Sequence, residues 1–216
     1  MKDLVWYACY GSNLYKKRFL YYIQGGGPEG ATELYKGCSN KNNPRDDKQI
    51  TIPYELYFSK RSSRWENRGV AFVKSEKRES AKTLGRMYLI NKEQFVEVVR
   101  QESDKDPDDD SIIIDIEAAI SKGSYRVPCI SWYGRIIYLG SERGYPIFTC
   151  TATWADEKTE LNRPGEEYLR FIIKGLKETY EYQDERIIEY LKNIKGIEGR
   201  IDDQEITRLV TSTQLE

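Results

Sequence analysis

The sequence contains no histidine among its 216 residues. A Ser-His-Asp triad, a Cys-His pair, an imidazole general base and a His-ligated zinc site are therefore excluded. Any proton transfer falls to Asp, Glu, Tyr, Lys or Cys side chains. The four cysteines lie far apart and form no CxxC pair, which excludes a zinc knuckle and a thioredoxin-type motif and favours buried thiols.

The sequence also lacks an excess of charge and a long apolar run. Lys and Arg number 34 against 35 Asp and Glu, and the isoelectric point is about 5.9, so no general attraction to nucleic acid or to an anionic membrane is expected. No stretch approaches the roughly 20 apolar residues that span a bilayer. Residues 1–7 lack the basic and apolar regions of a signal peptide. These absences predict a soluble, cytoplasmic protein.

Enough apolar side chain is present to build a core. Hydrophobic residues make up 39% of the chain and aromatic residues 12%, so the 32% of charged residues do not prevent folding. A length above the usual domain size of about 100–150 residues is compatible with one large domain or two small ones. Mixed strands and helices predict an α+β fold around a closed or strongly curved sheet.

Strand and helix patterns alternate along the chain. Strand patterns occupy residues 4–10, 50–58, 69–74, 83–90, 133–139 and 145–153, and the last two are expected to form a hairpin. Helix patterns occupy residues 15–23, 92–102 and 111–123, a segment that begins at Pro164, and residues 183–194.

The helix predicted over residues 92–102 has the clearest local signals. Asn91 is the expected N-cap, and Gln94 stands at the capping-box position. Glu93 and Glu97 lie toward the polar side of this helix, so we expect both carboxylates to be solvated.

The first candidate site is the turn that follows the first strand, where residues 7–14 read YACYGSNL. Gly11 permits close approach of the backbone to a ligand, and Ser12 and Asn13 are typical caps of a following helix. Several backbone N–H groups of such a turn can bind one anion. The alternative is an ordinary capped turn between a strand and a helix. Ser12 is disfavoured as a nucleophile, because no histidine is present to activate it.

The second candidate is Glu102. It follows Phe95 by seven residues, on the same helix face as the apolar Val98 and Val99. A carboxylate on a buried face is desolvated, so its pKa is expected to rise toward the range useful for proton transfer near neutrality. The alternative is a helix-terminal glutamate paired with Arg or Lys at the edge of a groove.

A resemblance to a known family joins the two candidates. Residues 10–14 (YGSNL) resemble the signature loop of the γ-glutamylcyclotransferase-like family. Three later segments resemble the family in the same order, namely residues 65–73 (WENRGVAFV), 85–102 (GRMYLINKEQFVEVVRQE) and 164–168 (PGEEY). The resemblance places the family's catalytic glutamate on Glu102 and the tyrosine that closes its substrate pocket on Tyr168.

The activity that the resemblance implies is an intramolecular aminolysis. The α-amine of a γ-glutamyl group attacks its own γ-carbonyl carbon, which gives 5-oxoproline and releases an amine. Glu102 would move the protons as general acid and base, and the turn amides would hold a substrate carboxylate or oxyanion. The residues implied to contact the substrate are Tyr7, Tyr10, Gly11, Ser12, Asn13 and Tyr168. The chemistry requires no metal and no organic cofactor.

The resemblance also favours one domain over two. It implies a single γ-glutamylcyclotransferase-like domain over residues 1–195, with a curved mixed sheet or small β-barrel surrounded by helices. Segments at about 25–48 and 103–127 read as insertions, because they are longer than in compact members of the family. Residues 196–216 read as a polar, partly mobile C-terminal tail.

Other functions are weighed against this one. A non-catalytic binding module of the same fold, which recognises an acidic or γ-glutamyl-like ligand or a partner protein, is the main alternative. Metal binding by the acidic residues of segment 104–110 is disfavoured, since the segment lacks the central Gly and terminal Glu of a calcium loop. The expected partner is a small γ-glutamyl substrate, with neither nucleic acid nor membrane, and a homodimer is compatible with the sequence.

Overall fold

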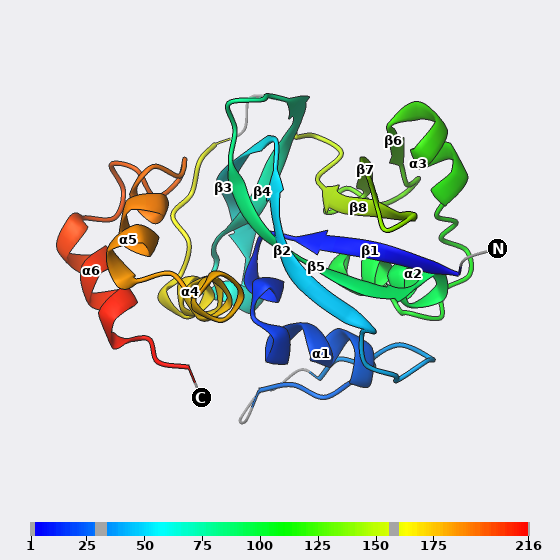
Figure 1. The fold of residues 1–216 in the computed structure, drawn as a ribbon, viewed down its shortest axis with the longest axis horizontal. Helices are drawn as coiled ribbons and strands as arrows, with labels where there is room; N and C mark the ends of the chain where they lie inside the picture. The colour runs from blue at the N-terminus through cyan, green and yellow to red at the C-terminus, as the bar shows by residue number, and fades with distance from the viewer. Residues whose placement is uncertain (1–2, 29–33, 156–159, 216) are drawn as a thin grey trace. The chain divides into compact units, whose positions relative to one another are not determined.

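The computed structural model of the chain describes residues 3–28, 34–155 and 160–215. These residues form two compact units, between which the chain passes several times (Figure 1). Unit 1 consists of the described parts of residues 1–9, 17–50 and 86–154, and unit 2 of the described parts of residues 10–16, 51–85 and 155–216.

Unit 1 is built on a mixed sheet, whose order within the described residues is β2-β5-β1-β8-β7-β6. Strand β1 (Leu4–Cys9) runs antiparallel to β5 (Thr83–Asn91) and parallel to β8 (Tyr145–Thr151). The remaining strands are β2 (Asp46–Ile52), β6 (Ser124–Arg126) and β7 (Arg135–Glu142), and the ends of β2 and β5, residues 51–52 and 83–85, belong to unit 2. The mixed sheet confirms the predicted α+β class, and the antiparallel β7–β8 pair confirms the predicted hairpin.

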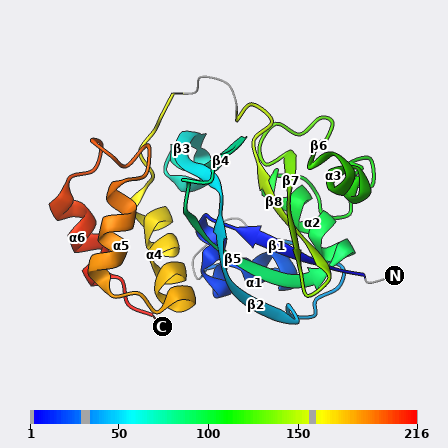
Figure 2. The ribbon, with the colours of Figure 1, turned by 45° about the horizontal axis from the view of Figure 1, so that its top comes forward.

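Helices of unit 1 bury their apolar residues against alternate residues of the sheet. The helices are α1 (Lys16–Gln24), α2 (Lys92–Glu102) and α3 (Ile116–Lys122), which are drawn beside the sheet in Figure 2. One core contains Val5, Tyr7 and Cys9 of β1 together with residues from all three helices. Because strand side chains alternate with a period of two, these three β1 side chains point to one face. Tyr7 is therefore directed toward the helices.

The start of α2 agrees with its sequence signals. The Asn91 side chain accepts a hydrogen bond from the Gln94 backbone N–H over 2.6 Å, and the Gln94 side chain accepts one from the Asn91 N–H over 3.1 Å. These reciprocal bonds satisfy two donors that the first helical turn leaves without a partner. The predicted capping box is confirmed.

The start of α3 differs from its prediction. The helix begins at Ile116 rather than near Ser111, because the Asp115 side chain caps it by accepting from Ala118 N over 2.8 Å. The residues before Asp115 are bound by Arg100 of α2 instead of forming a helical turn. The Arg100 guanidinium donates to the carbonyl oxygens of Pro107 and Ile112, which keeps this segment out of a helix.

Unit 2 combines a two-stranded sheet with helices. Its elements are β3 (Tyr54–Ser62), β4 (Arg68–Lys77), the short 3-10 turns η1 (Ser12–Leu14) and η2 (Ser63–Trp65), and helices α4 (Glu166–Tyr180), α5 (Asp184–Lys192) and α6 (Asp203–Ser212). The prediction of one strand over residues 50–58 is wrong. Pro53 separates β2 from β3, which belong to different sheets, because proline has no N–H to donate to a ladder.

The C-terminal segment after Gly196 is not the polar tail that the sequence predicted. It contains α6, in which Ile206, Leu209 and Val210 are buried. Asp202 caps the helix, since its side chain accepts from the backbone N–H of Glu205 over 2.7 Å. Burial of three apolar side chains on one helix face holds this segment to the rest of unit 2.

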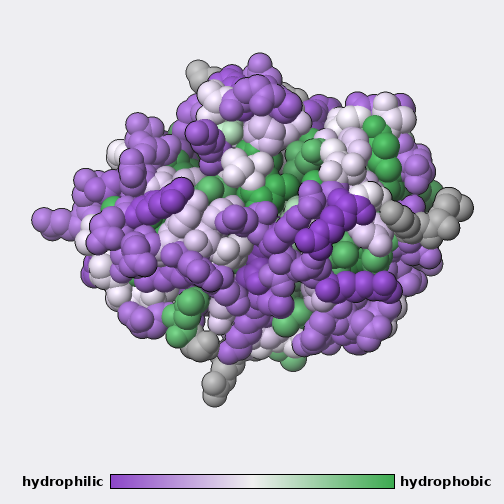
Figure 3. All heavy atoms as spheres, in the orientation of Figure 1, coloured by the Kyte–Doolittle hydropathy of each residue, from purple (hydrophilic) through white to green (hydrophobic). Residues whose placement is uncertain are grey.

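The structure describes the two predicted insertions to different extents. In the first, segment 25–48, residues 29–33 lie outside the described residues. Segment 103–127 includes all of α3 and β6. Within the described residues, no helix has both the length and the apolar composition that a membrane crossing requires. The face drawn in Figure 3 is covered mainly by hydrophilic side chains.

Candidate active site

The carboxylate of Glu102 is held by two phenols in unit 1. Glu102 is the last residue of α2 and is half-buried. The Tyr7 hydroxyl of β1 donates to Oε1 over 2.9 Å, and the Tyr22 hydroxyl of α1 donates to Oε2 over 3.1 Å. Hydrogen bonds to an ionised carboxylate are stronger than neutral ones, so this arrangement fixes the position of both oxygens.

A buried guanidinium lies next to these groups. Arg18 precedes Tyr22 by one turn of α1, so both side chains lie on the same helix face. The Arg18 guanidinium carbon is 5.1 Å from the centroid of the Tyr22 ring and 4.6 Å from that of Tyr35. The guanidinium also donates a hydrogen bond to the Tyr35 hydroxyl. Arg18 is thus enclosed by two aromatic rings.

The negative charge of Glu102 acts on the neighbouring weak acids. Burial raises the pKa of Tyr22 well above its ordinary value, and the Glu102 charge raises it further. Burial also raises the pKa of the Cys150 thiol, again with a contribution from Glu102. For Cys9, burial raises the pKa, Arg86 partly opposes this, and Glu102 adds to it. These phenol and thiol groups therefore stay protonated near neutrality, and the phenol remains a hydrogen-bond donor.

One face of α2 holds the chain segment that carries Tyr35. Gln94, Glu97 and Gln101 are spaced three and four residues apart, so they lie on one side of the helix. Their partners include backbone groups of residues 37–42. Gln94 Nε2 donates to the carbonyl oxygens of residues 40 and 42, and Gln101 Oε1 accepts from the N–H of residue 37.

The expectation that Glu97 is solvated is wrong. Its side chain is only 4% exposed. The carboxylate accepts from the Ser39 backbone N–H over 3.1 Å and from the Ser39 hydroxyl over 2.5 Å. These bonds replace water around the buried charge. Glu93 is exposed, as predicted.

In unit 2, the glycine of the YGSNL turn is closely approached by a tyrosine. A Cβ atom at Gly11 would lie 2.7 Å from the Tyr168 hydroxyl oxygen, closer than a real Cβ contact permits. The Tyr168 hydroxyl also accepts from the backbone N–H of Ala71 over 3.2 Å. Any side chain at position 11 would therefore have to displace the Tyr168 hydroxyl.

The turn itself is a short 3-10 element. The N–H of Leu14 donates to the Gly11 carbonyl over 3.0 Å, and the N–H of Tyr15 donates to the Ser12 carbonyl over 3.3 Å. Tyr10 and Asn13 are buried, whereas Gly11 and Ser12 are half-exposed. The backbone of this turn is thereby fixed before any ligand binds.

The predicted site residues fall into two clusters. In unit 1 the structure brings together Tyr7 and Glu102, and in unit 2 it brings together Gly11 and Tyr168. Sequence reasoning missed Arg18, Tyr22 and Tyr35. The spacing of Arg18 and Tyr22, four residues apart on the apolar face of a predicted helix, could have indicated the first two.

In the part of the chain that the structure describes, no group of three or more His, Cys, Asp or Glu side chains is placed to hold a metal ion. The acidic segment 104–110 has other contacts. Asp106 pairs with Lys36, and Asp110 lies 3.4 Å from a guanidinium nitrogen of Arg100.

Comparisons with solved structures identify the fold. The chain is similar to a γ-glutamyl cyclotransferase, with a TM-score of 0.50 and 16% identity over 97% of this chain and 99% of that chain. It is also similar to the uncharacterized protein loc79017 of Homo sapiens, with a TM-score of 0.51 and 15% identity over 98% of this chain and 100% of that chain. The chain therefore has the fold of the γ-glutamyl cyclotransferases.

The sequence comparison gives one relative of a different name. The chain is 37% identical over 198 residues to histone deacetylase 5 of Arabidopsis thaliana. The match covers 87% of this chain but only 30% of that protein. No protein-family model matches the chain.

Proposed function

We propose that this protein is a γ-glutamyl cyclotransferase-type enzyme that converts a γ-glutamyl amine or peptide to 5-oxoproline and a free amine. The observation that carries the proposal is the Glu102 carboxylate, whose two oxygens accept hydrogen bonds from Tyr7 and Tyr22 in a chain with the cyclotransferase fold. The name of the Arabidopsis relative belongs to a protein of which this chain matches 30%, so it assigns no deacetylase activity to the matched part.

The reaction needs little beyond orientation and proton transfer. The α-ammonium of the substrate gives a proton to Glu102, and the resulting amine nitrogen attacks the γ-carbonyl carbon. A new C–N bond closes the five-membered ring, and the bond from that carbon to the leaving nitrogen breaks. Glu102 returns this proton to the leaving nitrogen. The second proton of the attacking nitrogen then passes through Glu102 to the released amine, so the ring nitrogen ends as an amide N–H and Glu102 is again ionised. Because nucleophile and electrophile share one molecule, correct folding of the substrate alone can contribute about 7–11 kcal/mol.

The turn around Gly11 is assigned to substrate binding. The first N–H groups of a helical turn have no partner within the turn, so they are suited to bind a carboxylate or a developing oxyanion. We assign this role to Gly11, Ser12 and Asn13. Tyr10 and Tyr168 are assigned to the wall of the same site, next to the turn. All four cysteines are thiols, which fits a reducing compartment such as the cytoplasm.

The test is formation of 5-oxoproline, measured by mass spectrometry. The purified chain is given γ-glutamyl dipeptides, γ-glutamyl amines and glutathione. We expect turnover of at least one substrate, its loss in Glu102→Gln, and native activity in Glu93→Gln, which alters an exposed carboxylate of the same helix. An active Glu102→Gln protein would remove the catalytic assignment.

A non-catalytic binding module is the second candidate. It is favoured by one observation, that the Arabidopsis relative is a much longer protein in which the matched part makes up 30%. In that case a γ-glutamyl ligand should raise the melting temperature of the native chain without any release of 5-oxoproline. Turnover of the same ligand would decide against this candidate.

A further inference from the structure

Arg18 is a buried cation that the proposed reaction does not yet use. Only 3% of the surface of Arg18 is exposed to solvent. Burying a charge is costly unless other charges or hydrogen bonds compensate for it. Burial acts to lower the pKa of Arg18, but its interactions with Tyr22, Tyr35 and Glu102 raise it by more, so the guanidinium stays charged.

We propose that Arg18, held in place by Tyr35, is the positioning residue that keeps the Glu102 carboxylate ionised in its half-buried site. The inference rests on the proposed function, since it concerns the proton transfers of Glu102. Arg18 acts through Glu102 and through the Tyr22 ring, so it is not assigned any contact with the reacting atoms. Without a nearby cation, burial favours the protonated carboxyl, which cannot accept the substrate proton.

Arg18 is a cation that interacts by charge with Glu102. The groups that interact with Glu102 by hydrogen bond or by charge include Tyr7 and Cys9 of β1, Arg18 and Tyr22 of α1, and Cys150 of β8. Of the groups just named, Arg18 is a cation, whereas the phenols and thiols are neutral near pH 7.

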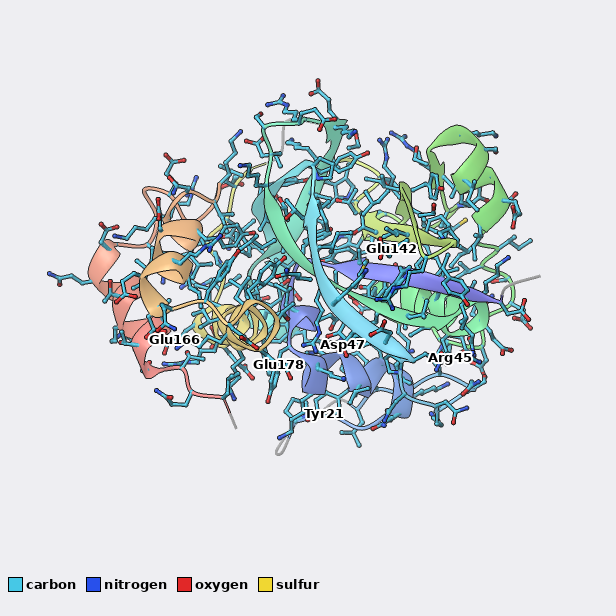
Figure 4. All side chains as sticks on the ribbon, in the orientation of Figure 1. Tyr21, Arg45, Asp47, Glu142, Glu166 and Glu178 are labelled. Atoms are coloured by element: carbon cyan, nitrogen blue, oxygen red, sulfur yellow. The ribbon has the colours of Figure 1, made fainter. Side chains whose placement is uncertain are left out.

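A second cation lies close by but has its own partner. Arg86 of β5 acts on Cys9, yet its Nε donates to Asp47 Oδ1 of β2 over 2.8 Å. Asp47 is labelled on β2 in Figure 4. The charge of Arg86 is therefore balanced by a neighbouring carboxylate.

Tyr35 is placed by the same helix that ends in Glu102. The backbone of Tyr35 exchanges two hydrogen bonds with Gly26, of 2.8 and 2.9 Å, and α2 holds the residues that follow Tyr35 through Gln94, Glu97 and Gln101. The Tyr35 ring is 4.5 Å from that of Tyr22. Loss of its hydroxyl would remove an acceptor from Arg18 while leaving the ring contact in place.

The test compares three substitutions by the pH dependence of kcat/KM for a γ-glutamyl substrate. Arg18→Met removes the charge at similar length, Arg18→Lys keeps the charge, and Tyr35→Phe removes only the hydroxyl. We expect the acid limb of the profile to move to higher pH in Arg18→Met, because loss of an opposite charge raises the pKa of a carboxyl, by roughly 1–3 units where the two groups are close. Arg18→Lys should keep the limb near its native position. An acid limb that stays at its native pH in Arg18→Met would overturn the proposal.

A measurement without turnover separates this inference from the proposed function. The carboxyl carbon of Glu102 is followed by NMR of protein labelled with ¹³C at glutamate, with Glu102→Gln to assign the signal. The titration midpoint should rise in Arg18→Met as the acid limb does. If Arg18→Met does not fold, Tyr35→Phe should give a smaller rise, and an unchanged midpoint there would overturn the inference. Absence of 5-oxoproline with the native protein would count against the function alone.

Discussion

The Tyr7 hydroxyl donates a hydrogen bond to Glu102 Oε1 over 2.9 Å, although 95 positions separate the two residues in the chain. The bond joins β1 to the C-terminal end of α2 within unit 1. Tyr7 of the strand is the donor and Glu102 of the helix is the acceptor. The Tyr22 hydroxyl of α1 donates to the second oxygen of the same carboxylate. Three elements thus fix the position of one carboxylate.

Removal of either phenol should reduce activity without unfolding the protein. Tyr22→Phe deletes the donor to Oε2, and Tyr7→Phe the donor to Oε1. A hydrogen bond to a charged group contributes about 1.5–3 kcal/mol, so kcat/KM for 5-oxoproline formation should fall roughly 10–100-fold in each variant. Tyr21→Phe is the matched control, since Tyr21 neighbours Tyr22 on α1 and is half-exposed (Figure 4). Equal activity of the Tyr21 and Tyr22 variants would contradict the prediction.

The contact between α4 and the YGSNL turn should tolerate no extra atom. At Gly175 of α4, a Cβ would lie 2.3 Å from Leu14 Cβ and 2.6 Å from the backbone nitrogen of Tyr15. Alanine gains about 1 kcal/mol in helix propensity over glycine, but overpacking against backbone costs about 1–3 kcal/mol or more.

We therefore expect Gly175→Ala to lower the melting temperature by several degrees in calorimetry, given about 2–4 °C per kcal/mol for a chain of this size. Glu167→Ala, an exposed position of the same helix, should melt near the native temperature. A stabilised Gly175→Ala protein would show that this contact is looser than the distances indicate.

Acid should weaken the attachment of α6 through Glu166. Hydrogen bonds from Arg208 of α6 and from Arg170 of α4 lower the pKa of Glu166 to about 2. Glu166 is labelled at the start of α4 in Figure 4. Because the folded pKa lies below the unfolded value near 4.5, the stabilising contribution is present above that value and is lost as pH falls toward 2.

The check is the melting temperature between pH 6 and pH 2. The native protein should lose more stability over this interval than Glu166→Gln, which cannot titrate at this position. The difference should be small, because the side chain is 42% exposed, and it should shrink at high salt. Parallel pH curves for the native and variant proteins would contradict the prediction.

Features that depend on neighbouring residues were predicted well from the sequence. The capping box of Asn91 and Gln94 spans three residues, and the helix that carries Glu102 has the bounds that its pattern indicates. The local signals of α6 were also present and were overlooked. Asp202 is a typical N-cap, and Ile206, Leu209 and Val210 have helical spacing.

Features that depend on distant residues could not be predicted. Glu97 is buried because Ser39, 58 positions away, supplies its hydrogen bonds. The contact of Arg18 with Tyr35 requires the path of a loop that has no periodic pattern. The extent of α3 was misjudged because Arg100 captures the carbonyl of Ile112, a residue that fits a helical pattern equally well.

The attachment of residues 37–42 to α2 determines which of these residues can be exchanged. Gln94, Glu97 and Gln101 bind mainly backbone groups of that segment, so its side chains can be exchanged with little effect on the attachment. Residues 37–42 can therefore be replaced as a unit, while α2 keeps the contacts that hold them. A replacement segment that keeps Tyr35, Cys38 and Ser39 should bind α2 as the native segment does. Substitutions in the core around α2, by contrast, would displace both this segment and Glu102.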